Sequence, residues 1–173
     1  MNKQIWTIGH STRSIESFIQ ILKAYDIKVL ADVRSLPGSD KFPQFNQDNL
    51  MVSLNENGIE YRYIPLLGGL RPAKKDSLND AWRNKSFRGY ADYMETDDFK
   101  KGINILVTLA GQKNTVIMCS EILWWRCHRS MIADYLKSEG WTVCHIRDEY
   151  TSEIHPYTSP AKIVGHKLTY HQS

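Results

Sequence analysis

Reactive and charged side chains are more crowded in residues 119–129 than anywhere else in the chain. Thiolates attack electrophiles and bind soft metals, carboxylates and imidazoles carry protons, and guanidinium groups bind anions. Packing in a core would explain the two cysteines of this segment, but not the acidic and basic residues beside them. We therefore expect a functional site here. Its candidate residues are Cys119, Glu121, Arg126, Cys127, His128 and Arg129.

One chemistry that fits this segment is that of a cysteine phosphatase or sulfurtransferase, in which a thiolate at a strand end is held by a loop of N–H groups and an arginine. Cys119 has the position of that thiolate. However, six residues separate Cys119 from Arg126, one more than in the usual phosphatase loop. Residues 123–125 are Leu-Trp-Trp, where such a loop needs small residues. Spacing and size therefore disfavour this hypothesis.

A second hypothesis is a zinc or iron site, because cysteine and histidine are suitable ligands for these metals. The ligands would be Cys119, Cys127 and His128, with His10 or His145 reaching in from other parts of the chain. The spacing is unfavourable, because no two cysteines form a C-x-x-C pair and adjacent ligands at a helix start cannot easily point at one ion. The sequence indicates no particular cofactor.

The third hypothesis is a polar pocket for an anionic, phosphate-bearing substrate related to nucleotides or nucleic acids. Guanidinium groups bind phosphate bidentately, and Trp124 or Trp125 can stack on a base unless both belong to the core. The catalytic candidates are Glu121, Asp32, His10, Cys119 and His128, and the substrate-binding candidates are Arg34, Ser11, Ser35, Arg126, Arg129, Gly68 and Gly69. We favour an enzyme of unspecified reaction, although the same groups suit a module that binds nucleic acid or a ligand without catalysis.

These candidates follow segments that have the composition of buried strands. The segments are residues 4–8, 28–33, 59–64 and 115–118. The carboxyl ends of parallel strands meet at one edge of a sheet, and a helix N-terminus there favours anions. We therefore expect one crevice at this edge, surrounded by His10, Asp32, Arg34, Glu121 and Arg129.

Helical periodicity alternates with the strands, and a fifth strand is expected at residues 141–146. The expected N-caps are Thr12 or Ser14, Asn46 and Thr96, and the expected stops are Gly58 and Gly140. This alternation predicts an α/β fold with a mostly parallel five-stranded sheet and helices on both faces, a Rossmann-like three-layer sandwich. The order of the strands is left open.

Residues 1–150 are expected to form a single α/β domain. Residues 151–173 are polar and lack long periodicity, so we expect a C-terminal tail or lid of the same domain. The segment 65–114 is too long for a simple crossover, which predicts an insertion beside the crevice.

The net charge of the 173-residue chain is +3, which by itself does not indicate a nucleic-acid binder. Residues 62–88 are locally basic and either attract phosphates or form a solvated loop. No apolar run reaches bilayer length and no export signal is recognisable, so we expect no membrane association and a cytoplasmic location. The three cysteines are then expected to be reduced thiols.

Five short motifs follow one another along the chain. They are Thr-Ile-Gly-His-Ser at 7–11, Asp-Val-Arg-Ser-x-Pro at 32–37, Leu-Gly-Gly at 67–69, Cys-x-Glu at 119–121 and Cys-His-Arg at 127–129. With this combination, the chain resembles the bacterial family named domain of unknown function 488 from roughly Gln4 to His145. The resemblance implies an intracellular α/β domain whose functional surface includes the motif positions. It implies no substrate.

Overall fold

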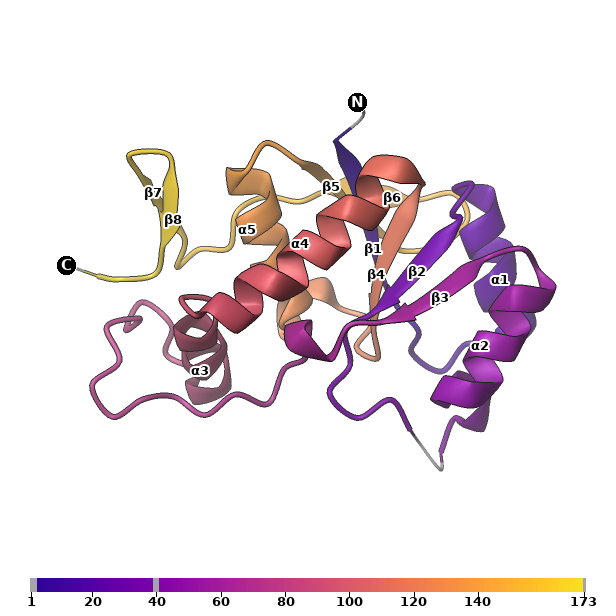
Figure 1. The fold of residues 1–173 in the computed structure, drawn as a ribbon, viewed down its shortest axis with the longest axis horizontal. Coiled ribbons are helices and arrows are strands. Elements are labelled where there is room, and N and C mark those ends of the chain that lie inside the picture. Colours follow the sequence, from indigo (N-terminus) through magenta and orange to yellow (C-terminus); the bar gives the residue numbers. More distant parts are fainter. Residues whose placement is uncertain (1–2, 39–40, 173) are drawn as a thin grey trace.

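A six-stranded, mostly parallel sheet forms the centre of the protein in the computed structural model, which describes residues 3–38 and 41–172 (Figure 1). Its strands are β1 Gln4–Gly9, β2 Val29–Asp32, β3 Glu60–Tyr63, β4 Thr115–Cys119, β5 Thr142–Ile146 and β6 Ser152–Ile154. Their order in the sheet is β3-β2-β4-β1-β5-β6. The first five strands are parallel and lie where the sequence predicts them. β6 is an additional strand that pairs antiparallel with β5.

The central strands bring the candidate residues to one edge of the sheet. All residues of β4 are buried, as expected for a parallel strand that is covered on both faces. In the strand register, Gly9 lies beside Cys119 and Asp32 lies beside Met118. Three strands therefore end at nearly the same level, and the residues that follow them are neighbours in space. This confirms the predicted edge.

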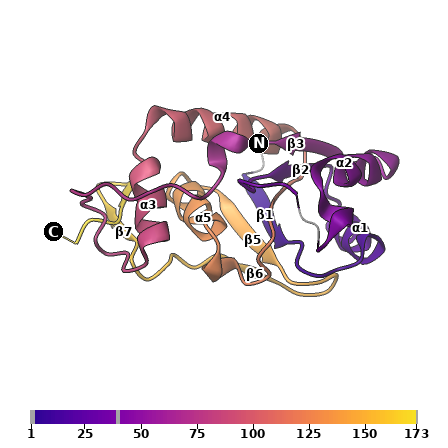
Figure 2. The ribbon, with the colours of Figure 1, turned by 90° about the horizontal axis from the view of Figure 1, so that it is seen from below.

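Five α-helices cover the two faces of the sheet. They are α1 Ile15–Ala24, α2 Gln47–Glu56, α3 Lys85–Tyr93, α4 Asp97–Gln112 and α5 Arg129–Ser138. One apolar cluster joins the sheet to α1 and α2, and a second joins its other face to α3, α4 and α5. Figures 1 and 2 agree that α1 and α2 lie at one end of the molecule and α3 at the other. The predicted three-layer α/β architecture is confirmed.

The helix ends follow the capping chemistry of the sequence. Ser14 accepts a hydrogen bond from the Ser17 N–H, and Thr96 accepts one from the Phe99 N–H. Asn46 is the N-cap residue of α2. Gly58 and Gly140 have positive φ angles of 73° and 92°, which glycine adopts without steric cost after a helix end.

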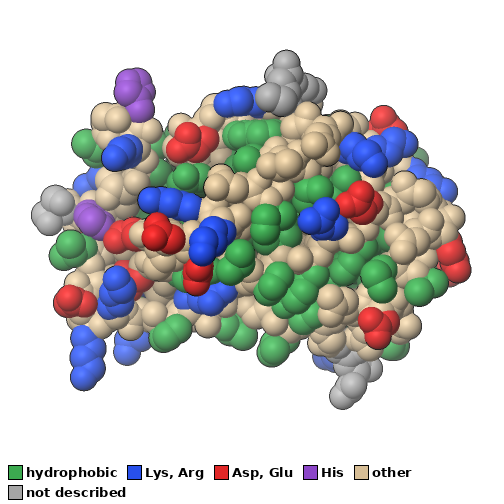
Figure 3. Space-filling model, viewed as in Figure 1, with side chains coloured by type: hydrophobic (Ala, Val, Ile, Leu, Met, Phe, Trp, Pro, Cys, Tyr) green, Lys and Arg blue, Asp and Glu red, His purple; other side chains and the backbone are tan. Residues whose placement is uncertain are grey.

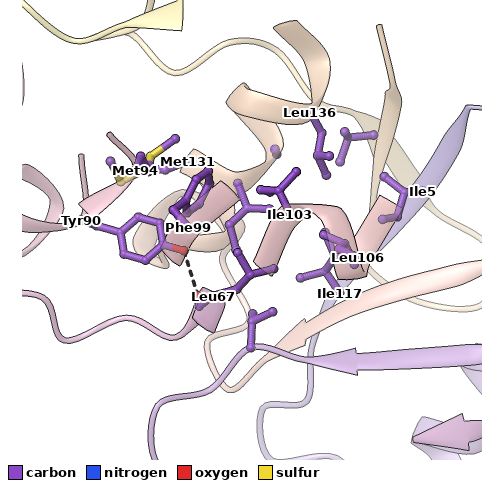
Figure 4. Packing of buried hydrophobic residues seen from close by; sticks show 14 of the residues in the cluster. Ile5, Leu67, Tyr90, Met94, Phe99, Ile103, Leu106, Ile117, Met131 and Leu136 are labelled. Atoms are coloured by element: carbon purple, nitrogen blue, oxygen red, sulfur yellow. Dashed lines mark hydrogen bonds between the residues drawn. The ribbon is translucent and has the colours of Figure 1, made fainter. Parts of the chain in front are cut away.

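The long segment after β3 packs its helices against the core of the sheet (Figure 4). It begins with the 3-10 turn η2, Pro65–Leu67, and the buried Tyr90 of α3 donates a hydrogen bond of 2.8 Å to the Leu67 carbonyl. Tyr90 also meets the ring of Phe99 edge-on. These contacts hold α3 beside the sheet edge, where an insertion was expected.

The C-terminal segment is tied to α5 by a buried carboxylate. Asp134 accepts hydrogen bonds from the backbone and hydroxyl of Thr158, from the Tyr170 hydroxyl at 2.6 Å, and from His155 at 2.8 Å. Between these residues lies a hairpin of β7 Lys162–Val164 and β8 Lys167–Thr169. The segment that the sequence presents as a tail or lid thus adds a strand to the sheet and buried contacts to α5, as far as residue 172.

Charges of both signs are mixed on one face of the molecule. On the face seen in Figure 3, Lys and Arg side chains are interspersed with Asp and Glu, in keeping with the small net charge. Among residues 3–38 and 41–172, no helix has both the length and the apolar character that a membrane span requires.

The Asp134 carboxylate generates a stability prediction. Tyr170→Phe removes a charge-assisted hydrogen bond in a buried site, so the free energy of unfolding should fall by about 1.5–3 kcal/mol. Tyr150→Phe is the matched control, because the Tyr150 side chain is exposed and its loss should change stability by less than about 0.5 kcal/mol. Urea unfolding measures both. Equal stability of the two variants would contradict the prediction.

Candidate active site

A pocket of about 730 Å³ lies at the carboxyl edge of the sheet. Its lining includes the turns after β1, β2 and β4 and three residues of α3. Of the site residues predicted from the sequence, the pocket brings together His10, Ser11, Arg34, Ser35, Gly69, Cys119, Glu121, Arg126, Cys127 and His128. Asp32, Gly68 and Arg129 lie outside its wall. The expected crevice therefore contains three of its five central residues, His10, Arg34 and Glu121.

Asp32 is completely buried and holds Arg34 in place. Arg34 donates to both carboxylate oxygens, with Nε to Oδ1 at 2.9 Å and Nη2 to Oδ2 at 2.8 Å. The Tyr61 hydroxyl donates to Oδ2 at 2.6 Å, and Arg34 Nη1 donates to the Phe45 carbonyl at 2.8 Å. The guanidinium N–H groups of Arg34 are thus engaged by other groups of the protein. Asp32 positions this guanidinium from behind the pocket wall.

His10 is a neutral imidazole with a defined tautomer. Its Nδ1 lies 2.9 Å from the Ser11 carbonyl, which can only accept, so Nδ1 carries the proton. Its Nε2 then accepts from Arg34 Nη1 at 3.4 Å, and its ring stacks on Phe45 with centroids 4.3 Å apart. Burial lowers the pKa of His10 from 6.5 to about 4, and the nearby Arg34 charge adds to the effect. His10 therefore faces the pocket without a charge at neutral pH.

Arg129 holds the loop that follows β4. Its guanidinium is buried and donates to the carbonyls of Glu121 and Ile122, to Thr7 Oγ1 at 3.2 Å, and to the sulfur of Cys119. All its hydrogen-bonding directions point into the protein. Arg129 therefore positions this loop and the thiol behind it instead of lying in the pocket wall.

A line of hydrogen bonds connects Arg129 with Asp134. Thr7 Oγ1 lies 2.6 Å from His145 Nδ1, and His145 Nε2 lies 2.8 Å from His155 Nδ1. The other nitrogen of His155 lies 2.8 Å from the Asp134 carboxylate, which can only accept. With one proton on each ring, both imidazoles accept at Nδ1 and donate at Nε2. Burial lowers the pKa of His145 to about 2, which keeps it neutral. The chain of donors runs in one direction from Arg129 to Asp134.

The loop after β4 fits closely against β1. A Cβ atom on Gly9 would lie 1.8 Å from the Glu121 carbonyl oxygen, so only glycine permits this approach. Ser11 has a φ of 53°, and its N–H donates to the Ser120 carbonyl at 3.0 Å. Glu121 lines the pocket and accepts from the Leu123 N–H at 3.3 Å. Backbone strain at Ser11 and the close packing at Gly9 coincide with the pocket wall.

Cys127 and His128 form a thiol–imidazole pair in the pocket. His128 Nε2 lies 3.0 Å from the Val33 carbonyl and must donate to it, which leaves Nδ1 as an acceptor, 3.6 Å from the sulfur of Cys127. Burial lowers the pKa of His128, so the ring is neutral at pH 7. A Cβ atom on Gly69 would lie 3.1 Å from Nδ1, so this glycine leaves room for the ring.

The two cysteines of the segment have opposite environments, although their sulfurs are 2.7 Å apart. Burial raises the pKa of the Cys119 thiol well above its usual value. Burial also opposes ionisation of Cys127, but the hydrogen bond shared with Cys119 and the charge and backbone N–H of Arg129 outweigh it, and the pKa of Cys127 is lowered. Of the two thiols, Cys127 therefore ionises more readily, and the thiolate is the reactive form of cysteine.

Sequence analysis names Cys119 among the catalytic candidates and Cys127 only as a member of the cluster and a possible metal ligand. A usable signal exists in the sequence, because Cys127 comes two residues before the first residue of α5 and directly before His128. Sequence analysis also missed the contribution of α3, whose residues Ser86, Phe87 and Tyr90 line the pocket. No local pattern indicates which face of that helix meets the site.

The tandem tryptophans belong to the 3-10 turn η3, Trp124–Arg126, and neither of them lines the pocket. Trp124 stacks on His145 with a centroid distance of 4.5 Å and donates to Glu153 at 2.8 Å. Trp125 is partly exposed and packs edge-on against Trp124. In the described part of the chain, no group of three or more His, Cys, Asp or Glu side chains is arranged to hold a metal ion.

Residues 14–136 match the family model described as Domain of unknown function DUF488. Those residues include α1 to α4 and most of α5, together with β2, β3 and β4. No curated protein matches the chain. No solved structure matches it either.

The burial of His10 predicts a pH dependence. Because the pKa of His10 is about 4 in the folded protein and 6.5 without burial, its contribution to stability is complete above pH 6.5 and is lost as the pH falls towards 4. Between pH 7 and pH 5 the free energy of unfolding should fall by about 2 kcal/mol on this account. Urea unfolding of wild type and His10→Asn at both pH values isolates the effect. Parallel pH curves for the two proteins would refute it.

Proposed function

The chain belongs to the family described as Domain of unknown function DUF488, and because that description names no activity, we propose a function from the pocket itself. We propose an enzyme that acts on a small anionic, phosphate-bearing substrate, with Cys127 as nucleophile and His128 as its base. The observation that carries the proposal is the Cys127 thiol in the pocket wall, with an acceptor nitrogen of His128 3.6 Å away. A thiol paired with a neutral imidazole is the usual arrangement for covalent catalysis by cysteine.

An anionic substrate is supported by the groups that remain available in the pocket. Arg126 is exposed, lines the pocket and forms no ion pair within residues 3–38 and 41–172. Cys127 and His128 of the pocket wall directly precede α5, and the dipole of a helix favours negative charge at its N-terminal end. The Ser35 hydroxyl is buried there and has no hydrogen-bond partner among residues 3–38 and 41–172, which suits an oxygen of the substrate.

In the proposed reaction, His128 Nδ1 takes the proton of the Cys127 thiol. The sulfur attacks the electrophilic centre of the substrate, a bond forms between them, and the bond to the leaving group breaks. The protonated His128, or Glu121 from the facing loop, gives a proton to the leaving group. Water then attacks the covalent intermediate and restores the thiol. Arg126 and the start of α5 stabilise the negative charge throughout.

A small substrate is favoured over a long nucleic-acid strand. A volume of about 730 Å³ suits a nucleotide-sized molecule. Trp124, a candidate for base stacking, already stacks on His145, and neither tryptophan belongs to the pocket wall. In the basic segment, Arg71 lies over the Tyr93 ring and donates to the Gly68 carbonyl, which leaves that guanidinium less available for phosphate.

The first test of this function measures alkylation of Cys127 by iodoacetamide. Cys127 should react before Cys119 and Cys144, because its pKa is lowered and it lines the pocket. Millimolar inorganic phosphate or a nucleoside monophosphate should slow the reaction several-fold, whereas a neutral nucleoside should slow it less. Mass spectrometry of the labelled peptides gives the rates.

Arg126→Gln should weaken this protection, and Arg83→Gln is the matched control, because Arg83 is exposed and lies outside the pocket wall. Preferential labelling of Cys119 would remove Cys127 as the nucleophile. Equal protection in wild type and Arg126→Gln would remove Arg126 from the anion site.

The second test concerns proton transfer by Glu121. Glu121→Gln keeps an oxygen that can accept from the Leu123 N–H, so the loop and the ligand affinity should be preserved. If Glu121 transfers a proton, turnover of a phosphate ester found by screening should fall by roughly two to four orders of magnitude. Cys144→Ala is the control, since Cys144 lies in the core on the other face of the sheet and should leave turnover unchanged. Unchanged turnover in Glu121→Gln would assign the proton transfers to His128.

A further inference from the structure

We propose that Cys127 reacts with peroxides and that Cys119 then forms a reversible disulfide with it. The geometric basis is the direct contact of the two sulfurs, 2.7 Å apart at the end of the central strand β4 and just before α5. Both side chains line the pocket, so a peroxide entering the pocket meets a thiol that already has its partner beside it. Both cysteines are free thiols and are therefore available for oxidation.

The surroundings assign different roles to the two thiols. Cys127 is the peroxide-reactive one, because the nearby Arg129 charge and N–H favour its thiolate and His128 can take its proton. Cys119 is the more buried thiol, with 3% of its surface exposed against 8% for Cys127, and burial keeps it protonated. A reactive thiolate in front of a protonated partner is the arrangement of a peroxide-reactive cysteine with its resolving cysteine.

The chemistry balances in two steps. The Cys127 thiolate attacks one oxygen of the peroxide, an S–O bond forms, the O–O bond breaks, and the departing oxygen takes a proton to become water or an alcohol. The sulfur is oxidised to a sulfenic acid and the peroxide is reduced. Cys119 then loses its proton, its sulfur attacks that of Cys127, the S–S bond forms, and the S–O bond breaks with loss of water. A dithiol reductant reverses the disulfide by thiol exchange and is itself oxidised.

This reactivity does not depend on which substrate the pocket takes. If Cys127 is also the nucleophile of the proposed enzyme, the disulfide removes that nucleophile, and peroxide inactivates the enzyme until a dithiol restores it. The third cysteine gives an internal reference. Cys144 is buried in β5, belongs to the core on the face covered by α1 and α2, and its sulfur accepts from Gln4 at 3.5 Å.

The experiment treats the reduced full chain with hydrogen peroxide and maps the thiols by mass spectrometry. The expected result is a disulfide between the peptides of Cys119 and Cys127, loss of two of the three free thiols, and recovery of both with dithiothreitol. Cys127→Ser should slow the loss of thiols by at least about tenfold. Cys144→Ala should form the disulfide at the wild-type rate.

Cys119→Ala should stop at the sulfenic acid of Cys127, which dimedone traps, and should proceed with more peroxide to acids that dithiothreitol does not reduce. The proposal is overturned if wild-type protein yields no Cys119–Cys127 disulfide, or if Cys127→Ser loses thiols as fast as wild type. Disulfide mapping needs no substrate and requires only folded wild-type protein. Failure of the redox proposal is therefore distinguishable from failure of the proposed enzyme.

Discussion

The buried guanidinium of Arg129 is the interaction on which the site depends. A charge in the core is tolerated only when its donors are satisfied, and Arg129 meets this need with two carbonyls of the loop after β4, with Thr7 and with Cys119. The same hydrogen bonds bend that loop over β1 and bring Glu121 to the pocket wall. The same hydrogen bonds therefore shape the loop after β4 and satisfy the buried charge of Arg129. They form only when β1, β4 and α5 have assembled.

The charge of Arg129 is linked to the distant Asp134 carboxylate through a hydroxyl and two imidazoles. Hydrogen bonds run from Arg129 to Thr7, from Thr7 to His145, from His145 to His155 and from His155 to Asp134. Asp134 in turn binds the C-terminal segment, so that segment supports the site without lining the pocket. A cooperative hydrogen-bond chain of this kind is stiff, because each member sets the tautomer of the next.

The polar groups at the pocket divide into a supporting set and an available set. Arg34 forms hydrogen bonds with Asp32 and with the Phe45 carbonyl, and Arg129 donates to the Glu121 carbonyl. These hydrogen bonds make the wall of the pocket rigid. Cys127 and Arg126 remain directed to the pocket side, beside a neutral His128. Preorganised positions with few mobile charges are what a site needs to hold a nucleophile in place.

Local patterns in the sequence determined the elements and the edge at which they end. Five strands, their helices, the caps at Ser14 and Thr96 and the stops at Gly58 and Gly140 follow from periodicity and backbone preferences that act over a few residues. The family membership of the chain is likewise a property of its motifs. The sequence does not predict β6, because this edge strand is short and mostly exposed and therefore has no hydrophobic pattern. It is defined by its pairing with β5.

Only the tertiary structure decided the direction of the charged side chains and the different surroundings of the two cysteines. Arg34 turns to Asp32 and the Phe45 carbonyl, and Arg129 turns to Thr7, 122 residues away along the chain. Cys119 and Cys127 are the same residue type in the sequence. In the structure, burial raises the pKa of the Cys119 thiol, whereas the pKa of the Cys127 thiol is lowered beside the start of α5. The physical reason is that desolvation and hydrogen bonding depend on neighbours in space, which the sequence does not place next to one another.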